Sequence, residues 1–259
     1  MPFRPNGIVS LLTDFGLSDG YVAQMKAVML GISPSLRFVD ITHDVPAGDV
    51  AQGAFLLEEA ARWFPVGTVH LAVVDPGVGS SRSALAITAG DHVFIGPDNG
   101  LLPPAAGTLS PDPRARVLEG VTPPGGTVSA TFHGRDLFAP AAAEVACGLR
   151  APEAFGPLIR PTPAPRRPTK TPDTGRVLHI DHFGNLITSF PAASLDGVDA
   201  LEIRGHVVPT RVDCYAEAPA GTPVFLVGSS GRVEVSVVNG SAADRLGISP
   251  GAEVLLRRS

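Results

Sequence analysis

Short apolar runs alternate with segments of helical periodicity through the first half of the chain. The apolar runs typical of buried strands cover residues 8–13, 36–41 and 69–74. Between them, residues 17–32 and 49–64 carry apolar side chains at the spacing of amphipathic helices, and Asp49 is placed to cap the second helix. Strands that alternate with helices in this way predict a parallel α/β sheet.

The same pattern becomes less regular after the third predicted strand. Residues 84–88 and 92–96 predict a β-hairpin. Residues 103–130 are rich in Pro, Gly and Thr and predict a long irregular excursion. A helical pattern returns over 136–149. We assign residues 1–158 to one α/β N-terminal domain with a mainly parallel sheet.

The last third of the chain has a different texture. Prolines gather in residues 159–174, which we interpret as a linker. Beyond it, short β-type runs are separated by Gly, Pro or Asp turns, as is typical of a small antiparallel sheet or barrel. Residues 175–259 are therefore expected to form a smaller, all-β, barrel-like C-terminal domain.

Composition narrows the class of protein. The 259 residues are 44% hydrophobic and 17% charged, which predicts a sizeable core. The net charge of −5 argues against broad nucleic-acid binding. No apolar run reaches membrane-spanning length, no N-terminal signal pattern is present, and the two cysteines have no metal-type spacing. We expect a soluble cytoplasmic protein with no nucleic-acid, membrane or metal partner.

Polar residues follow two of the predicted strands, at the end where ligands bind in open α/β sheets. Asp14 follows the first strand, where a carboxylate can accept hydrogen bonds from ribose hydroxyls. Asp75 follows the third strand, and a Gly- and Pro-rich turn leads from it to Arg82. His133 precedes the later helix. These side chains can move a proton or stabilise developing charge, although a turn, an ion pair or a structural histidine explains each one singly.

Two turns of the C-terminal domain also carry candidate ligand-binding groups. In IDHFGN at 180–185, Asp181 ends a strand, Phe183 offers a ring that can stack on a planar base, and Asn185 offers a donor and an acceptor. GSSGR at 228–232 can present backbone amides and hydroxyls. Ordinary hairpin turns explain both stretches equally well.

Seven motifs carry a resemblance to a known family. They are TDFG at 13–16, ITHDVPAGD at 41–49, VVDPGVGSSR at 73–82, PDNG at 97–100, TFHGRD at 131–136, IDHFGN at 180–185 and NGSAADRLG at 239–247. In this order they resemble the S-adenosylmethionine hydroxide adenosyltransferases, the hydrolytic relatives of the fluorinase and chlorinase enzymes. The resemblance covers both predicted domains. It implies a reaction in which S-adenosylmethionine and water give adenosine and methionine.

The resemblance also implies roles for individual residues. The resemblance implies a catalytic role for Asp75, Arg82 and His133. The residues to which it gives a substrate-binding role are Asp14 for the ribose hydroxyls, Asp181, Asn185 and Ser229 for the methionine portion, and Phe183 for the pocket wall. It implies no cofactor, because S-adenosylmethionine is the substrate. The resemblance also implies a trimer, with each active site between the N-terminal domain of one subunit and the C-terminal domain of a neighbour, so we expect a homotrimer.

The implied chemistry suits these residue types. A sulfonium is a good leaving group, so the site needs only an oriented, partly deprotonated water in line with the sulfur. Arg82 is suited to stabilise hydroxide character, and either Asp75 or His133 to accept the proton. Two alternatives remain. One is an adenosyl-halide synthase, against which the Asp75 carboxylate argues because it would repel chloride. The other is a protein that binds adenosine or S-adenosylmethionine without reaction.

Overall fold

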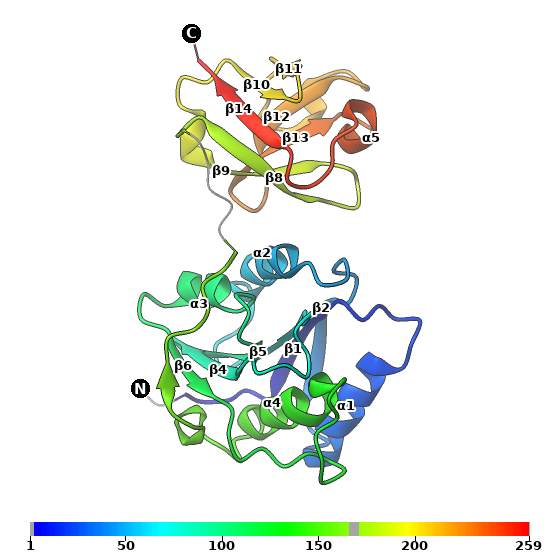
Figure 1. Cartoon of the computed structure of the whole chain (residues 1–259). Helices are drawn as coiled ribbons and strands as arrows, with labels where there is room; N and C mark the ends of the chain where they lie inside the picture. Colours follow the sequence, from blue (N-terminus) through cyan, green and yellow to red (C-terminus); the bar gives the residue numbers. More distant parts are fainter. Residues whose placement is uncertain (1–2, 166–170, 259) are drawn as a thin grey trace. The chain divides into compact units, whose positions relative to one another are not determined.

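The chain forms two compact units, Met1–Arg166 and Arg167–Ser259, in the computed structural model, which describes residues 3–165 and 171–258 (Figure 1). The division falls within the predicted linker, and residues 166–170 of that linker lie outside the described residues. In the described part of the chain, no helix has the length and apolar character needed to cross a bilayer.

The first unit is built on a seven-stranded sheet of order β2-β1-β3-β5-β4-β6-β7. Its strands are β1 (Ile8–Thr13), β2 (Arg37–Thr42), β3 (Val69–Val73), β4 (Ala84–Ala89), β5 (His92–Pro97), β6 (Arg114–Val117) and β7 (Leu158–Ile159). The neighbouring strands β2, β1, β3 and β5 pair in parallel. The pairs β5–β4, β4–β6 and β6–β7 are antiparallel. The sheet is therefore mixed, because the predicted hairpin of β4 and β5 adds an antiparallel half to the parallel one.

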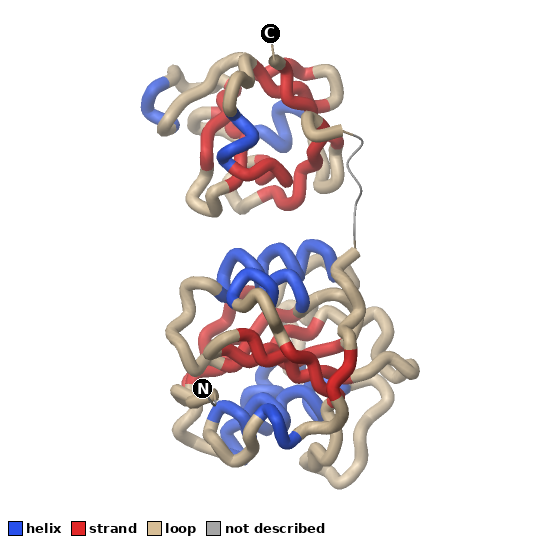
Figure 2. Tube along the Cα trace, turned by 90° about the vertical axis from the view of Figure 1, so that its left-hand side faces the viewer, coloured by secondary structure: helices blue, strands red, loops and turns tan. Residues whose placement is uncertain are grey.

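Helices cover both faces of this sheet (Figure 2). They are α1 (Tyr21–Ile32) and α4 (Ala139–Ala146) on one face, and α2 (Val50–Ala61) and α3 (Pro103–Leu109) on the other. Met25 and Met29 of α1 are fully buried in the core that contains α4, and Leu57 of α2 is fully buried in the core that contains α3. Asp49 caps α2 as predicted, since its side chain accepts a hydrogen bond from the Gln52 amide at 3.0 Å.

The predicted irregular excursion over residues 103–130 is wrong in its first half. Helix α3 begins at Pro103, and proline is compatible with the first turn of a helix because those amides need no intrahelical partner. Strand β6 then pairs with β4. The predicted helix at 136–149 instead begins as a π-helical turn, Gly134–Phe138, and continues as α4.

The second unit is a seven-stranded sheet of order β11-β10-β14-β8-β9-β13-β12, in which every pair is antiparallel. Its strands are β8 (Thr174–Ile180), β9 (Leu186–Pro191), β10 (Ala200–Ile203), β11 (His206–Val208), β12 (Pro223–Val227), β13 (Arg232–Val237) and β14 (Glu253–Arg257). The unit also contains the α-helix α5 (Ala242–Leu246) and two short 3-10 helices, Ala192–Leu195 and Tyr215–Glu217. The edge strands β11 and β12 contact each other, so the sheet is nearly closed around its apolar core. This confirms the prediction of an all-β C-terminal part.

Candidate active site

Three neighbouring parallel strands of the first unit end at the same edge of the sheet. Asp14 directly follows β1, Asp75 lies two residues after β3, and Asn99 lies two residues after β5. Because ligands bind at the carboxyl ends of parallel strands, this edge is the expected position of a site.

The turn after β3 brings Arg82 back toward Asp75 and packs against the segment that leads to His133. Gly79 in this turn has a φ of +77°, and a Cβ there would lie 2.4 Å from the carbonyl oxygen of Ala130. Only glycine allows both that backbone conformation and that close approach. The turn therefore joins two segments that are about 50 residues apart in the sequence.

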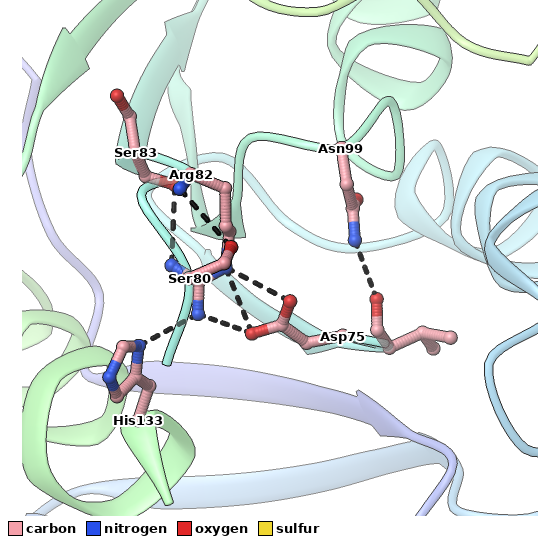
Figure 3. A network of polar contacts seen from close by, with 7 residues as sticks. Asp75, Ser80, Arg82, Ser83, Asn99 and His133 are labelled. Carbon is pink, nitrogen blue, oxygen red and sulfur yellow. Dashed lines mark hydrogen bonds and ion pairs between the residues drawn. The ribbon is translucent and has the colours of Figure 1, made fainter. Parts of the chain in front are cut away.

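Arg82 connects Asp75 to His133 (Figure 3). Its Nε donates to both oxygens of the Asp75 carboxylate, at 2.9 and 3.0 Å, and its Nη2 donates to Oδ2. The same Nη2 donates to His133 Nδ1 at 2.8 Å. The side chains of Asp75 and Arg82 are only 4% and 10% exposed, so water screens their interaction poorly. The structure thus brings together the three residues predicted to be catalytic.

The hydrogen bond from Arg82 defines the protonation of His133. Burial lowers the pKa of His133 from its ordinary value of 6.5, and the positive charge of Arg82 lowers it further, against the opposing charges of Asp75 and Asp136. A guanidinium only donates hydrogen bonds, so Nδ1 accepts and the neutral ring carries its proton on Nε2. His133 can therefore donate from Nε2. Among Asp75, Arg82 and His133, only the Asp75 carboxylate can still accept a further hydrogen bond or a proton in this arrangement.

Asn99 supports this arrangement and was not among the predicted site residues. Its Oδ1 accepts from the Leu101 amide at 3.2 Å. Its Nδ2 donates to the carbonyl oxygen of Val74 at 2.8 Å (Figure 3). The contact fixes the backbone immediately before Asp75. The motif PDNG at 97–100 contained the signal, because it places an amide side chain at a strand end.

A pocket of about 570 Å³ adjoins these residues, a volume within the usual range for small-molecule sites. Asp14, Asp75 and His133 line this pocket. Arg82 is not a lining residue; it lies behind Asp75 and His133, to which it is hydrogen-bonded. Three aromatic rings that sequence reasoning missed complete one side, with centroids 5.2–6.0 Å apart; they belong to Phe15, Tyr21 and Phe132. Among the described residues, no three His, Cys, Asp or Glu side chains come together as metal ligands do.

The Asp14 carboxylate is hydrogen-bonded to the described part of the chain through only one of its two oxygens. The Gly48 amide donates to its Oδ2 at 2.8 Å, and Oδ1 accepts no hydrogen bond from the described residues. A Cβ at Gly48 would meet only the Pro76 side chain, at 3.6 Å. Asp14 itself lines the pocket, so its Oδ1 is available to a ligand there.

The other four predicted residues belong to the second unit. Asp181 organises its own loop, because Oδ1 accepts from the amides of Phe183 and Asn185 at 2.9 and 2.8 Å. Its Oδ2 accepts from the Asn185 side chain at 2.9 Å. Phe183 is 73% exposed, and Ser229 is exposed in the turn between β12 and β13. The structure therefore joins Asp181 to Asn185 and leaves the other two side chains in contact with solvent.

Two family models match the chain over most of its length. The N-terminal domain of the S-adenosylmethionine hydroxide adenosyltransferases matches residues 9–156, and the C-terminal domain of the same enzymes matches residues 175–255. The chain belongs to this family. The predicted resemblance is confirmed.

Individual relatives agree with this assignment. Proteins named (R)-S-adenosyl-L-methionine hydrolase are 42% identical over 254 residues in Salinispora tropica and 44% identical over 258 residues in Thermus thermophilus, covering 95% and 96% of this chain and 96% and 98% of theirs. The crystal structure of a conserved protein from Thermotoga maritima matches with a TM-score of 0.89 at 31% identity, over 96% of this chain and all of that one. A fluorinase from Actinoplanes is more distant, at 27% identity over 290 residues, which cover 91% of this chain and 92% of that protein.

Proposed function

We propose that this protein is an enzyme that hydrolyses S-adenosyl-L-methionine to adenosine and L-methionine. The observation that carries the proposal is the cluster of Asp75, Arg82 and His133 beside a pocket that also contains Asp14. The names of the hydrolase relatives, at more than 40% identity over nearly the whole chain, support the same activity.

In the proposed reaction, a water oxygen attacks the ribose 5′ carbon as the bond from that carbon to sulfur breaks. The bonding electron pair goes to sulfur, which leaves as the neutral thioether of methionine. Asp75 accepts the proton of the water, because His133 already uses Nδ1 as an acceptor for Arg82. His133 Nε2 donates a hydrogen bond to the developing hydroxide, and the charge of Arg82 stabilises it from behind both residues. The reaction requires neither a cofactor nor a metal.

Binding residues contribute by fixing the 5′ carbon in line with the water and the sulfur. Asp14 Oδ1 accepts hydrogen bonds from the ribose hydroxyls, while Gly48 holds Oδ2. The residues proposed to hold the methionine portion are Asp181, Asn185 and Ser229, with Phe183 at the pocket wall. Orientation of this kind contributes about 7–11 kcal/mol to lowering the barrier in well-aligned reactions.

The configuration at sulfur is part of the proposal. The hydrolase relatives are named for the (R) epimer of S-adenosyl-L-methionine. We infer that this chain prefers the same epimer, since in-line attack places the leaving sulfur and its methyl group at fixed positions. Separate assays of the (R) and (S) epimers test this inference.

We also propose a cytoplasmic homotrimer in which the C-terminal domain of one subunit completes the site of another. The family resemblance supports this assembly. Light scattering tests the mass. Mixing a His133→Ala variant with an Asp181→Ala variant tests the shared site, because mixed trimers would contain some intact sites and regain part of the activity. Activity that stays absent in trimers shown to exchange subunits would contradict a shared site.

The decisive experiment is incubation with S-adenosylmethionine in ¹⁸O-labelled water, with and without excess chloride. Adenosine labelled at the 5′ oxygen is expected under both conditions. Chlorinated adenosine would instead identify a halide synthase. Substrate that binds but stays intact would identify a binding protein without this activity.

A further inference from the structure

His43 is a buried histidine that no step described above uses. It lies directly after β2, at the edge of the sheet where the parallel strand β1 also ends, and it is 3% exposed. Its Nδ1 lies 2.8 Å from the hydroxyl oxygen of Thr13, the last residue of β1, which is itself fully buried. Buried polar side chains are costly unless they are paired, so this contact stabilises both of them.

Asp40 on β2 sets the position of the proton in the His43 ring. Its Oδ1 lies 3.2 Å from His43 Nε2, and its Oδ2 accepts a hydrogen bond from Lys26 of α1 at 2.7 Å. Burial raises the pKa of Asp40, but the hydrogen bond from Lys26 and the contact with His43 outweigh this effect and hold it below its ordinary value. The ionised carboxylate favours the proton of the uncharged ring on Nε2. His43 Nδ1 then accepts a hydrogen bond from the Thr13 hydroxyl.

The contacts of His43 lie on both sides of Asp14, the residue proposed to bind the ribose. The Thr13 hydroxyl oxygen also accepts a hydrogen bond from the Phe15 amide at 3.3 Å. The carbonyl oxygen of His43 accepts one from the Gly16 amide at 2.8 Å. Asp14 lies between these points, so His43 fixes the backbone before and after it and thereby the direction of its side chain.

The second support of Asp14 comes from the same loop as His43. The Gly48 amide donates to Asp14 Oδ2 at 2.8 Å. One hydrogen bond to one oxygen does not fix the plane of a carboxylate. The direction of Oδ1, the oxygen available to a ligand, therefore also depends on the backbone of Asp14, which His43 holds.

We propose that His43, oriented by Asp40, is a positioning residue that directs Asp14 Oδ1 at the ribose hydroxyls and so sets the preference for ribose over deoxyribose. This inference rests on the proposed function, which supplies a substrate with a ribose. His43 is not among the described residues that line the pocket, so it acts through Asp14 and not on the substrate itself. Hydrogen bonds weaken steeply when their geometry is lost, so a small turn of the Asp14 carboxylate weakens its bonds to the hydroxyls.

The test compares S-adenosylmethionine with its 2′-deoxy analogue, which lacks one of the hydroxyls that Asp14 would bind. His43→Leu keeps a large buried side chain but removes both ring nitrogens. We expect the ratio of kcat/KM for S-adenosylmethionine to that for the analogue to fall about fivefold or more in this variant, because a hydrogen bond to a charged group is weakened. Thr13→Val removes the hydroxyl and is expected to lower the ratio in the same way, whereas Thr13→Ser keeps the hydroxyl and the ratio.

His92→Leu is the matched control, because His92 is a buried histidine of the same sheet that contacts His70. It is expected to leave the ratio unchanged. An unchanged ratio in a folded His43→Leu protein would overturn the proposal, because a purely structural role lowers the turnover of both substrates equally. If His43→Leu does not fold, the two Thr13 variants decide, and equal ratios in Thr13→Val and Thr13→Ser overturn the proposal.

Equilibrium dialysis with adenosine and 2′-deoxyadenosine measures the same preference as a ratio of Kd values and needs no turnover. A protein that does not hydrolyse S-adenosylmethionine, yet prefers adenosine and loses this preference in His43→Leu, contradicts the proposed function and supports the positioning role. Hydrolysis with the same ratio in both proteins supports the proposed function and overturns the positioning role. Equal affinity of the unchanged protein for the two nucleosides, or no binding of either, also overturns it.

Discussion

Arg82 Nη2 donates to His133 Nδ1 at 2.8 Å while the same guanidinium holds both oxygens of Asp75. One side chain therefore sets the orientation of the two groups that face the pocket. It also supplies the positive charge nearest to them. Removal of Arg82 is expected to disturb both groups, whereas removal of either partner leaves the other one held.

The first prediction concerns turnover. Arg82→Ala is expected to lower kcat by about 10²–10³-fold, the usual cost of removing a preorganised charge-stabilising group, and to change KM only a few-fold. The reason is that Arg82 lies behind the pocket wall and does not hold the substrate. Steady-state kinetics with S-adenosylmethionine measure both constants. Arg114→Ala, at an exposed side chain where β6 begins, is the control, and an Arg82→Ala variant with normal kcat but a high KM would contradict the assigned role.

The second prediction concerns the protonation of His133. Its pKa lies below 6.5 because of burial and the charge of Arg82, while Asp75 and Asp136 act in the opposite direction. Arg82→Met removes the positive charge and keeps the carboxylates, so the pKa of His133 is expected to rise. An NMR titration of the ring Cε1 proton measures it in both proteins. A pKa that stays the same or falls would show that Arg82 does not act on this ring.

Part of this site followed from the sequence, and part required the fold. The positions of Asp14 and Asp75 were predictable, because each follows an apolar run at a strand end. The contact of His133 with Arg82 was not, since it depends on Gly79 packing against Ala130 across about 50 residues. Periodicity gives the elements but not which loops meet.

The errors in the fold have a similar cause. The composition of residues 103–130 favours loops, yet tertiary packing against α2 and β4 stabilises α3 and β6 there. The seven-stranded C-terminal sheet was predicted only as a class. Its strand order depends on long-range pairing that short β-type runs do not specify.

The third prediction concerns the turn between Asp75 and Arg82. Gly79→Ala places a Cβ 2.4 Å from the Ala130 carbonyl at a φ of +77°, so the backbone must move. We expect a loss of about 1–3 kcal/mol in the free energy of unfolding and a clear loss of turnover. Urea denaturation and kinetics measure the two effects. Gly125→Ala is the control because nothing lies within 4 Å of its Cβ and no positive φ is involved; equal effects of both variants would contradict the prediction.

The last prediction concerns a buried histidine pair near the N-terminal ends of β3 and β5. Ser10 Oγ lies 2.7 Å from His70 Nδ1, and His70 Nε2 lies 3.1 Å from His92 Nδ1, across β1, β3 and β5. Burial, and to a lesser extent the charge of His92, lower the pKa of His70 from 6.5 to about 3. Between these pH values the unfolded chain binds a proton that the folded chain does not. The stability that His70 contributes is therefore present above pH 6.5 and is lost as the pH falls toward 3, at up to about 1.4 kcal/mol per pH unit.

Amide hydrogen exchange in β3, corrected for its intrinsic pH dependence, measures this slope of stability against pH. His70→Gln is expected to make the slope shallower, whereas His206→Gln on the exposed strand β11 is expected to leave it unchanged. An identical slope in His70→Gln and the unchanged protein would show that His70 is already protonated in the folded state.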